Sequence, residues 1–448
     1  MNRNYFYIAL VFLFVAASGF IFFKYQTEKK IEQKKIYTLL PRTNALAGLV
    51  EWKDKQANFK NLLKTIEKDR SDVKSMLALA SLFLSEARVT GNYNYYDNAA
   101  LKLINEIQSI DPKNFDAITY KAMIFLSQHH FAEALVVIKE AEVINPYSAF
   151  LYGLMVDAYV ELGNYKEALI AADKMITIRP DLRSYSRISY LREIHGDFKG
   201  AIEAMQMAVD AGSPGDETTE WTRIQLGKLY EYTGDLTNAE INYAIALTNR
   251  PGYAYANAGM GRIAAVKKEY TKAIGFYKAA DSVLNDYSFK DAMAALYSIS
   301  GNEQMSQTLN KEVVVIMEDA FKQSKTYDTV GHYADREMAY AYLNVNNTAK
   351  AMEHALMEYD RRPANIDVNE ALAWVYFKQE QYEFALKYIE TALSTNSQNP
   401  ELLCRAAFIY YKNNQQAKAK TLLQTALKTN PSFSIRLKNE AEQLLQTI

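Results

Sequence analysis

A catalytic or metal-binding site would need histidine, cysteine or carboxylate side chains at fixed spacings, and this sequence offers few such sets. Its five histidines form no HExxH pattern and have no partner cysteines; they are His129, His130, His195, His332 and His354. The first three lie in predicted turns between helices, where we expect solvated imidazoles. The only cysteine, Cys404, lies in a predicted helix without a surrounding motif, so we expect a buried and inert thiol. No GxxxxGKS or GxGxxG pattern follows a strand. The sequence therefore predicts a protein that is not an enzyme and uses neither a metal nor a cofactor.

The charged residues are almost balanced, with 51 basic and 52 acidic side chains in 448 residues. A nucleic-acid-binding face needs a sustained positive field. Here arginines such as Arg183 and Arg336 share their predicted surface with acids such as Asp157 and Asp367. The sequence therefore predicts no nucleic-acid partner, and it contains no evident motif for a small-molecule substrate.

The positions of the prolines indicate a repeat. Pro112, Pro146, Pro180 and Pro214 follow one another at intervals of 34 residues, and Pro251 comes 37 residues later. Proline ends a helix because it lacks the amide hydrogen that would continue the hydrogen-bond ladder. Self-similarity at this spacing is the signature of a solenoid. Stacked repeats are therefore a better interpretation than the roughly three globular domains that length alone suggests.

The repeating unit reads as a pair of amphipathic helices, with apolar residues at i, i+3, i+4 and i+7. In the clearest unit, 226–251, Gly227 allows the two helices to approach closely and Tyr230 fills the space beside it. Gly234 marks the turn, and Ala239 is the small contact residue of the second helix. This pattern resembles the tetratricopeptide repeat, a helix-turn-helix unit of about 34 residues. The matching alanines are Ala100, Ala134, Ala168, Ala201, Ala239, Ala273, Ala351, Ala385 and Ala419.

The resemblance implies an all-α fold, a right-handed α-solenoid (superhelix) of about ten tetratricopeptide units. Capping helices are expected at both ends, because a solenoid needs polar-faced ends, and one transmembrane helix is expected at the N-terminus. The expected segments are a tail (1–4), a transmembrane anchor or uncleaved signal segment (5–23), a linker (24–44), a capping helix (45–71), repeats one to six (72–286), a degenerate seventh repeat with a long helix (287–331), repeats eight to ten (332–431) and a second capping helix (432–448).

The expected anchor is an uncharged apolar run over residues 5–23, long enough to cross most of a bilayer. The alternative is a signal peptide cut near Ala16-Ala17-Ser18. The lysines after the run favour a body held in the cytoplasm, whereas a short apolar N-terminus led by a basic residue is typical of an exported chain. The second pattern leads us to expect a single-pass, membrane-anchored protein with an extracytoplasmic body. The stretches 182–212, 371–393 and 422–434 also resemble bacterial membrane-anchored or secreted repeat proteins.

The resemblance further implies that the first helix of each pair lines a concave groove that binds a partner. Aromatic and arginine side chains are the types that dominate binding hot spots. Arg183 and Arg187, four residues apart on one helix face, are suited to hold a carboxylate. The alternative is that repeat packing uses the aromatics and that the arginines pair with neighbouring acids. The candidate groove residues are Tyr120, Phe150, Arg183, Arg187, Tyr190, Trp221, Arg262, Arg336 and Trp374.

The predicted function is a non-catalytic scaffold that binds a protein or peptide in its concave groove at the membrane, with cell-envelope assembly as the expected process. Two alternatives stay open at this stage. One is a self-associating structural protein, and the other is a regulatory subunit of a membrane enzyme or transporter.

Overall fold

The computed structural model describes the chain except for residues 1–2, 35, 285 and 325–330. It also leaves undescribed the side chains of 3–6, 8–10, 25–26, 28–34 and 323–324. The start of the predicted tail therefore lies outside the described residues. Within the described residues the chain forms 24 α-helices and no strand, so the prediction of an all-α fold is confirmed.

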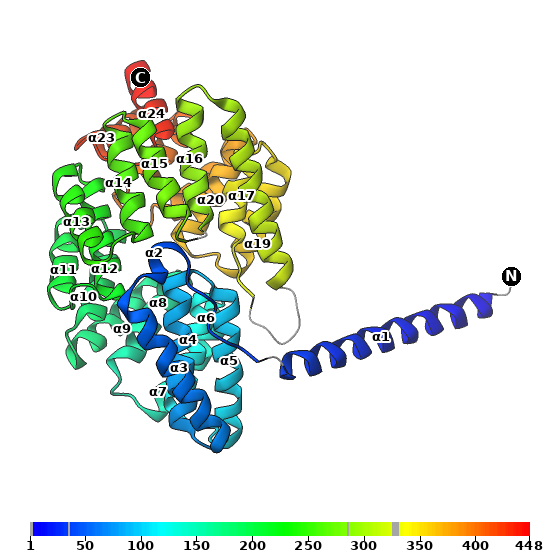
Figure 1. Ribbon diagram of the computed structural model, residues 1–448. Helices are drawn as coiled ribbons and strands as arrows, with labels where there is room; N and C mark the ends of the chain where they lie inside the picture. The colour runs from blue at the N-terminus through cyan, green and yellow to red at the C-terminus, as the bar shows by residue number, and fades with distance from the viewer. Residues whose placement is uncertain (1–2, 35, 285, 325–330) are drawn as a thin grey trace.

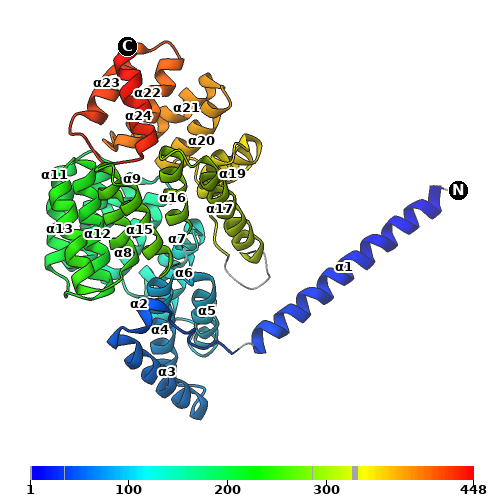
Figure 2. The ribbon, with the colours of Figure 1, turned by 45° about the horizontal axis from the view of Figure 1, so that its top comes forward.

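Helix α1 (Arg3–Lys34) contains the expected anchor and extends away from the rest of the molecule in both views (Figures 1 and 2). Among the described residues, no helix is both long enough and apolar enough to cross a membrane. The predicted transmembrane helix is therefore not supported. Residues 5–6 and 8–10 of the expected anchor lie outside the described side chains.

Ten helix pairs follow one another in the described chain, and each helix packs against its partner and against the next pair. We number these pairs as repeats one to ten. The pairs are α4 (Val73–Thr90) and α5 (Tyr93–Ile110), α6 (Phe115–Ser127) and α7 (Phe131–Ile144), α8 (Ala149–Glu161) and α9 (Tyr165–Ile178), α10 (Leu182–Ile194) and α11 (Phe198–Asp210), α12 (Glu217–Tyr232) and α13 (Leu236–Asn249), α14 (Ala254–Val266) and α15 (Tyr270–Asp281), α16 (Tyr287–Ile299) and α17 (Glu303–Ser324), α18 (Asp335–Asn344) and α19 (Thr348–Arg361), α20 (Ile366–Lys378) and α21 (Tyr382–Ala392), and α22 (Pro400–Lys412) and α23 (Gln416–Leu427).

The turn inside every repeat contains one residue in the left-handed conformation. This residue lets the chain leave the first helix and reverse direction, and glycine adopts it at the lowest energy. Glycine fills the position in five repeats, and histidine, lysine, asparagine or glutamate fills it in the others. In chain order the ten residues are Gly91, His129, Gly163, Gly196, Gly234, Lys268, Gly301, Asn346, Glu380 and Asn414.

Small residues set the distance between paired helices. Ala134, Ala168 and Ala239 of the second helices are completely buried. Gly227 leaves room for the ring of Tyr243, because a Cβ atom at this glycine would overlap that ring. Tyr243 is itself fully buried. The repeat pattern therefore corresponds to real contacts between helices.

The two ends of the array are covered by helices outside the repeats. Helix α3 (Val50–Lys68), preceded by the short α2 (Asn44–Ala47), packs on α4, and α24 (Ile435–Thr447) packs on α22 and α23. These helices lie at opposite ends of the body in Figure 2. Part of the expected linker is also packed, since the Leu40 amide donates a 2.9 Å hydrogen bond to the Tyr96 hydroxyl.

The array winds back on itself, so that its second half lies against its first. Turns inside repeats one to five contact loops roughly 200 residues further along the chain. These loops lie before repeats seven to ten and before α24. We call this line of contacts the seam; its contacting pairs are Gly91 with Leu284, His129 with Tyr333, Gly163 with Ala364, Gly196 with Asn396, and Gly234 with Thr429.

Candidate functional site

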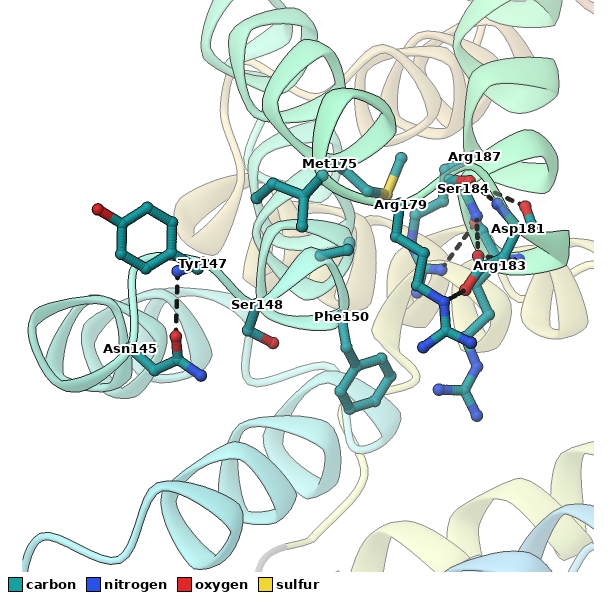
Figure 3. Close-up of a pocket in the computed structure, with 13 residues that line it drawn as sticks. Asn145, Tyr147, Ser148, Phe150, Met175, Arg179, Asp181, Arg183, Ser184 and Arg187 are labelled. Atoms are coloured by element: carbon teal, nitrogen blue, oxygen red, sulfur yellow. Dashed lines mark hydrogen bonds and ion pairs between the residues drawn. The ribbon is translucent and has the colours of Figure 1, made fainter.

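A pocket of about 330 Å³ lies between the starts of two first helices, α8 and α10. Residues from the loops before these helices and from the end of α9 complete its wall. In Figure 3 the side chains of Phe150, Arg179 and Arg183 gather on one side of the pocket, and Asn145 and Tyr147 lie on the other. The lining residues are Asn145, Tyr147, Ser148, Ala149, Phe150, Gly153, Met175, Ile178, Arg179, Asp181, Arg183, Ser184 and Arg187. Three candidate groove residues, Phe150, Arg183 and Arg187, are thus brought together in one site.

Arg187 is held by a carboxylate on the neighbouring helix. Its Nε and Nη2 atoms donate to the two oxygens of Asp157 over 2.8 and 2.6 Å, and its Nη1 donates to the Arg183 carbonyl over 3.1 Å. Gly153 makes space for this guanidinium, since a Cβ atom there would lie 3.2 Å from it. A two-point arginine–carboxylate pair fixes the plane of the guanidinium. Arg187 therefore forms a rigid wall of the pocket with its charge already balanced.

Arg183 has a different environment. Its guanidinium lies 4.7 Å from the centre of the Phe150 ring, which orients it through a cation–π contact. It forms no ion pair within the described chain. Asp181, the acid that acts on it electrostatically, accepts the Arg183 and Ser184 amides and pairs with Arg179 over 3.2 Å. Arg183 is solvent-exposed at the pocket, and partial desolvation together with the charge of Arg187 lowers its pKa. The pocket therefore holds an oriented guanidinium whose positive charge is not neutralised.

Two other candidate arginines are neutralised by acids. Arg262 contacts the Glu231 carboxylate over 2.9–3.0 Å and donates to the Tyr243 hydroxyl over 3.0 Å. Arg336 pairs with Glu337 over 2.7 Å and with Asp367 over 3.1 Å. These contacts correspond to the alternative interpretation, in which the arginines pair with neighbouring acids.

The remaining candidates, all aromatic, have separate positions. Trp374 is 8% exposed and stacks on Phe377 with ring centres 4.8 Å apart, so it contributes to packing. Tyr120 is half-buried against the core of repeats one and two. Tyr190 and Trp221 are each 38% exposed, and no contact joins either of them to the pocket.

First helices of the two halves face one another around an inner surface. Tyr190 on α10 lies within the electrostatic influence of Glu161, Glu193, Arg336 and Asp367. Burial raises the pKa of Glu193 to about 7 and lowers that of Lys228 to about 8, and neither side chain has an ion pair or hydrogen bond in the described chain. We define the inner surface by Tyr190, Glu193, Lys228, Arg262, Arg336 and Asp367.

The expectation of solvated turn histidines is wrong for two of the three. His129 and His130 pack on the loop before α18, because the returning half of the array covers this turn. His195 stays exposed and hydrogen bonds to the Leu191 carbonyl of its own helix. Cys404 is completely buried, and burial raises its thiol pKa to about 12, so the prediction of a buried thiol is confirmed. The described residues contain no cluster of three or more potential metal ligands.

Sequence reasoning did not find Arg179, Asn145 or Tyr147 as members of the pocket. Asn145 and Arg179 occupy equivalent places, each directly after a second helix. The groove positions of the repeat were counted on first helices only. The pocket residues that this count missed lie in the loops at which neighbouring repeats meet, so the loop positions would also have to be counted.

Comparison with solved structures gives several similar α-solenoids, all of low sequence identity. The human IFIT1 dimer with PPP-AAAA is 12% identical, with a TM-score of 0.48, over 76% of this chain and 78% of that one. A tetratricopeptide repeat protein from Parabacteroides merdae is 17% identical, with a TM-score of 0.33, over 59% and 97% of the two chains. YrrB, a tetratricopeptide repeat protein with an unusual peptide-binding site, is 21% identical, with a TM-score of 0.30, over 43% and 96%. No curated protein sequence matches the chain.

Sequence profiles give a direct assignment. Three separate regions match tetratricopeptide repeat profiles: residues 151–182, 224–284 and 376–439. The matches lie in the early, middle and late parts of the same helical array, and the last extends into α24. The chain belongs to the tetratricopeptide repeat family.

Proposed function

We propose that the protein is a non-catalytic scaffold whose pocket between α8 and α10 holds an acidic group of a protein or peptide partner. The observation that carries this proposal is the guanidinium of Arg183, which is oriented by Phe150 and has no acidic partner in the described chain. Family membership supports a role in protein interaction, and fold and family together are typical of non-catalytic scaffolds.

The charge arrangement favours an anionic group. Asp157 balances Arg187, and Asp181 balances Arg179, so the positive charge of Arg183 is left over. A carboxylate is suited to the free donors of an arginine fork. The cavity is at the small end of the usual range for ligand pockets, so it accommodates a few side chains and leaves the rest of a partner outside.

The proposal can be tested by selecting peptides on the full-length protein from a random phage-displayed library. We expect enrichment of peptides with aspartate, glutamate or a free C-terminal carboxylate. Arg183→Gln should lose at least tenfold in affinity for the selected peptides, because a charged hydrogen bond contributes about 1.5–3 kcal/mol. Arg436→Gln is the matched control, since Arg436 is an exposed arginine on α24. Recovery of the same peptides by Arg183→Gln with equal affinity would refute the proposal.

We further propose that α1 tethers the scaffold to a membrane, with the body on the extracytoplasmic side and a role in envelope assembly. The uncharged run over 5–23 supports this, as does the exposure of apolar side chains such as Phe12, Phe14 and Phe23. Fractionation of cells into membrane and soluble parts, followed by protease treatment of intact cells or spheroplasts, tests both statements. Recovery of the full chain in the soluble fraction contradicts the tether, and protection of the body from protease contradicts the assigned side.

A further inference from the structure

At the centre of the seam, two histidines from repeat two meet a histidine and a tyrosine that precede repeat eight. The rings of His129 and His332 lie 4.2 Å apart, and those of His130 and Tyr333 stack at 4.0 Å. The Tyr333 amide donates to the Gln128 carbonyl over 3.1 Å. We call these four side chains the histidine junction. It joins parts of the chain about 200 residues apart through rings that can gain charge.

The hydrogen bonds of the junction define the proton positions. His129 Nδ1 lies 2.8 Å from the Tyr333 carbonyl oxygen, and His130 Nε2 lies 2.6 Å from the Gly331 carbonyl oxygen. A carbonyl only accepts, so each of these nitrogens carries a proton in the neutral ring. An added proton must therefore go to the other nitrogen and make the ring cationic.

The charged groups around the junction do little to stabilise such a cation on His129 or His332, whereas a cation on His130 would have the Glu133 carboxylate beside it. From α18, Glu337 faces both His129 and His332, but it is engaged by Arg336. From α19, Glu358 is engaged by Arg362 and Arg361, and Arg362 itself repels a charge on His129. The nearby acid of α7, Glu133, lies 3.5 Å from His130.

Asp97 of α5 lies on the other side of the same turn and accepts hydrogen bonds from Ser127 and Gln128. It belongs to the same half of the array as that turn. Its titration therefore does not distinguish a closed seam from an open one.

Protonation opposes the closed seam. Burial and the neighbouring His332 lower the pKa of His129 to about 3, and burial lowers the pKa of His332. Separated from each other and hydrated, both rings would return to the ordinary pKa near 6.5. A group whose pKa is lower in the closed state stabilises that state above pH 6.5 and loses this effect as the pH falls. Acidification therefore favours separation of the two halves.

The other contacts of the seam can break without unfolding of the repeats on either side. It consists mainly of contacts between turns and loops, such as the 2.8 Å hydrogen bond from the Ile366 amide to the Tyr165 hydroxyl and the 2.9 Å bond from the Ser432 amide to the Glu231 carbonyl. The buried apolar clusters follow consecutive repeats, and Ile366 is the residue of the second half that joins the buried core of repeats two to four. Segments with few shared apolar contacts are those that open most readily.

We propose that the seam is a reversible gate to the inner surface, opened by separation of the two halves of the superhelix, and that the histidine junction is its pH-sensitive latch. Opening would expose Glu193 and Lys228, the two inner-surface charges without an ion pair in the described chain. That the gate admits a partner rests on the proposed function, whereas the opening itself does not.

Distance measurement between spin labels on the full-length protein, without any partner, tests the gate. One label is placed at Val136→Cys on α7 and the other at Glu353→Cys on α19, both at exposed positions on opposite sides of the seam. Between pH 7.5 and pH 5.5, the ratio of open to closed molecules should rise about tenfold for each histidine that the closed state keeps neutral. A second pair, Val136→Cys with Ile170→Cys, lies in adjacent repeats of one half and should report an unchanged distance.

Three variants test the latch. The double variant, His129→Asn with His332→Asn, should abolish the response to pH. The single variant His332→Gln should reduce it, and it serves as the test if the double variant does not fold. His195→Asn should keep the response, because that histidine hydrogen bonds within its own helix and its ring contact, with Tyr165, stays inside the first half. A cross-seam distance that is identical at both pH values overturns the gate, and a full pH response in the folded histidine variants overturns the latch. Neither result depends on peptide binding, so failure of this inference is distinguishable from failure of the proposed function.

Discussion

A single methyl group at Gly163 should push the seam apart, and the same change at Gly301 should not. Both glycines occupy the left-handed position of a repeat turn, with φ of 79° and 82°. A Cβ atom at Gly163 would overlap the backbone carbonyl of Ala364 across the seam, whereas a Cβ atom at Gly301 would meet nothing within 4 Å. Gly163→Ala and Gly301→Ala therefore share the backbone strain and differ in the contact.

The expected magnitudes follow from these two terms. The left-handed conformation costs alanine about 1–2 kcal/mol relative to glycine, and this term applies to both variants. Overpacking against the fixed backbone at Ala364 adds about 1–3 kcal/mol at Gly163 only. The seam can relieve that overlap by moving apart at the expense of the neighbouring contacts. These are the ion pair of Arg362 with Glu161, the buried Ile366 side chain, and hydrogen bonds such as Ile366 N to Tyr165 Oη. Each such bond contributes only about 0.5–1.5 kcal/mol.

Hydrogen–deuterium exchange measured on proteolytic peptides provides the assay. In Gly163→Ala, peptides that contain Ile366 should exchange about 5–150 times faster than in Gly301→Ala, which corresponds to the added 1–3 kcal/mol. Peptides from α14 and α15, away from this contact, should be equal in the two variants. Equal exchange at Ile366 in both variants, or faster exchange in Gly301→Ala, would refute the description of the seam.

Two further predictions concern stability. Gly227→Ala should lower the free energy of unfolding by about 1–3 kcal/mol, because its Cβ overlaps the buried Tyr243 ring. Gly275→Ala, which has open space around it, should raise the free energy of unfolding by about 0.5–1 kcal/mol through helix propensity alone. Urea unfolding measures both values, and destabilisation of equal size in the two variants would contradict the proposed helix spacing. Asp97→Asn should stabilise the protein by about 1–3 kcal/mol at pH 7, because burial raises the pKa of Asp97 to about 6 and its ionised form is disfavoured in the fold. This gain should shrink as the pH falls from 7 towards 4, where the native aspartate is also neutral. The variant also places an amide near the buried Gln128 Oε1, which lacks a hydrogen-bond donor. A stability gain that is independent of pH would contradict the assignment.

The sequence alone was sufficient for the helices and their pairing. Residues that determine this level act over three or four positions or within one repeat, such as Ala239 at the helix contact and Gly234 in the turn. The space beside Gly227 is filled by Tyr243 of the paired helix, whereas the sequence pattern predicted Tyr230 there. Their spacing is visible in the sequence because each repeat presents the same local packing problem. The positions of Arg183 and Arg187 on one helix face follow from the same periodicity, and the carboxylate-binding hypothesis for them could be formed before the structure was known.

Tertiary structure decided which charges are available and which turns are covered. Arg262 and Arg336 match the groove positions as well as Arg183 does, but acids on their own and neighbouring helices neutralise them. The seam depends on the curvature of the superhelix, which accumulates small rotations over many repeats and brings His129 to His332. No sequence pattern within a single repeat encodes this accumulated curvature. The sequence by itself thus determined the helix pair of each repeat and the order of the repeats along the chain. Only the three-dimensional array determined that Arg183 has no acidic partner and that the histidine junction closes the seam.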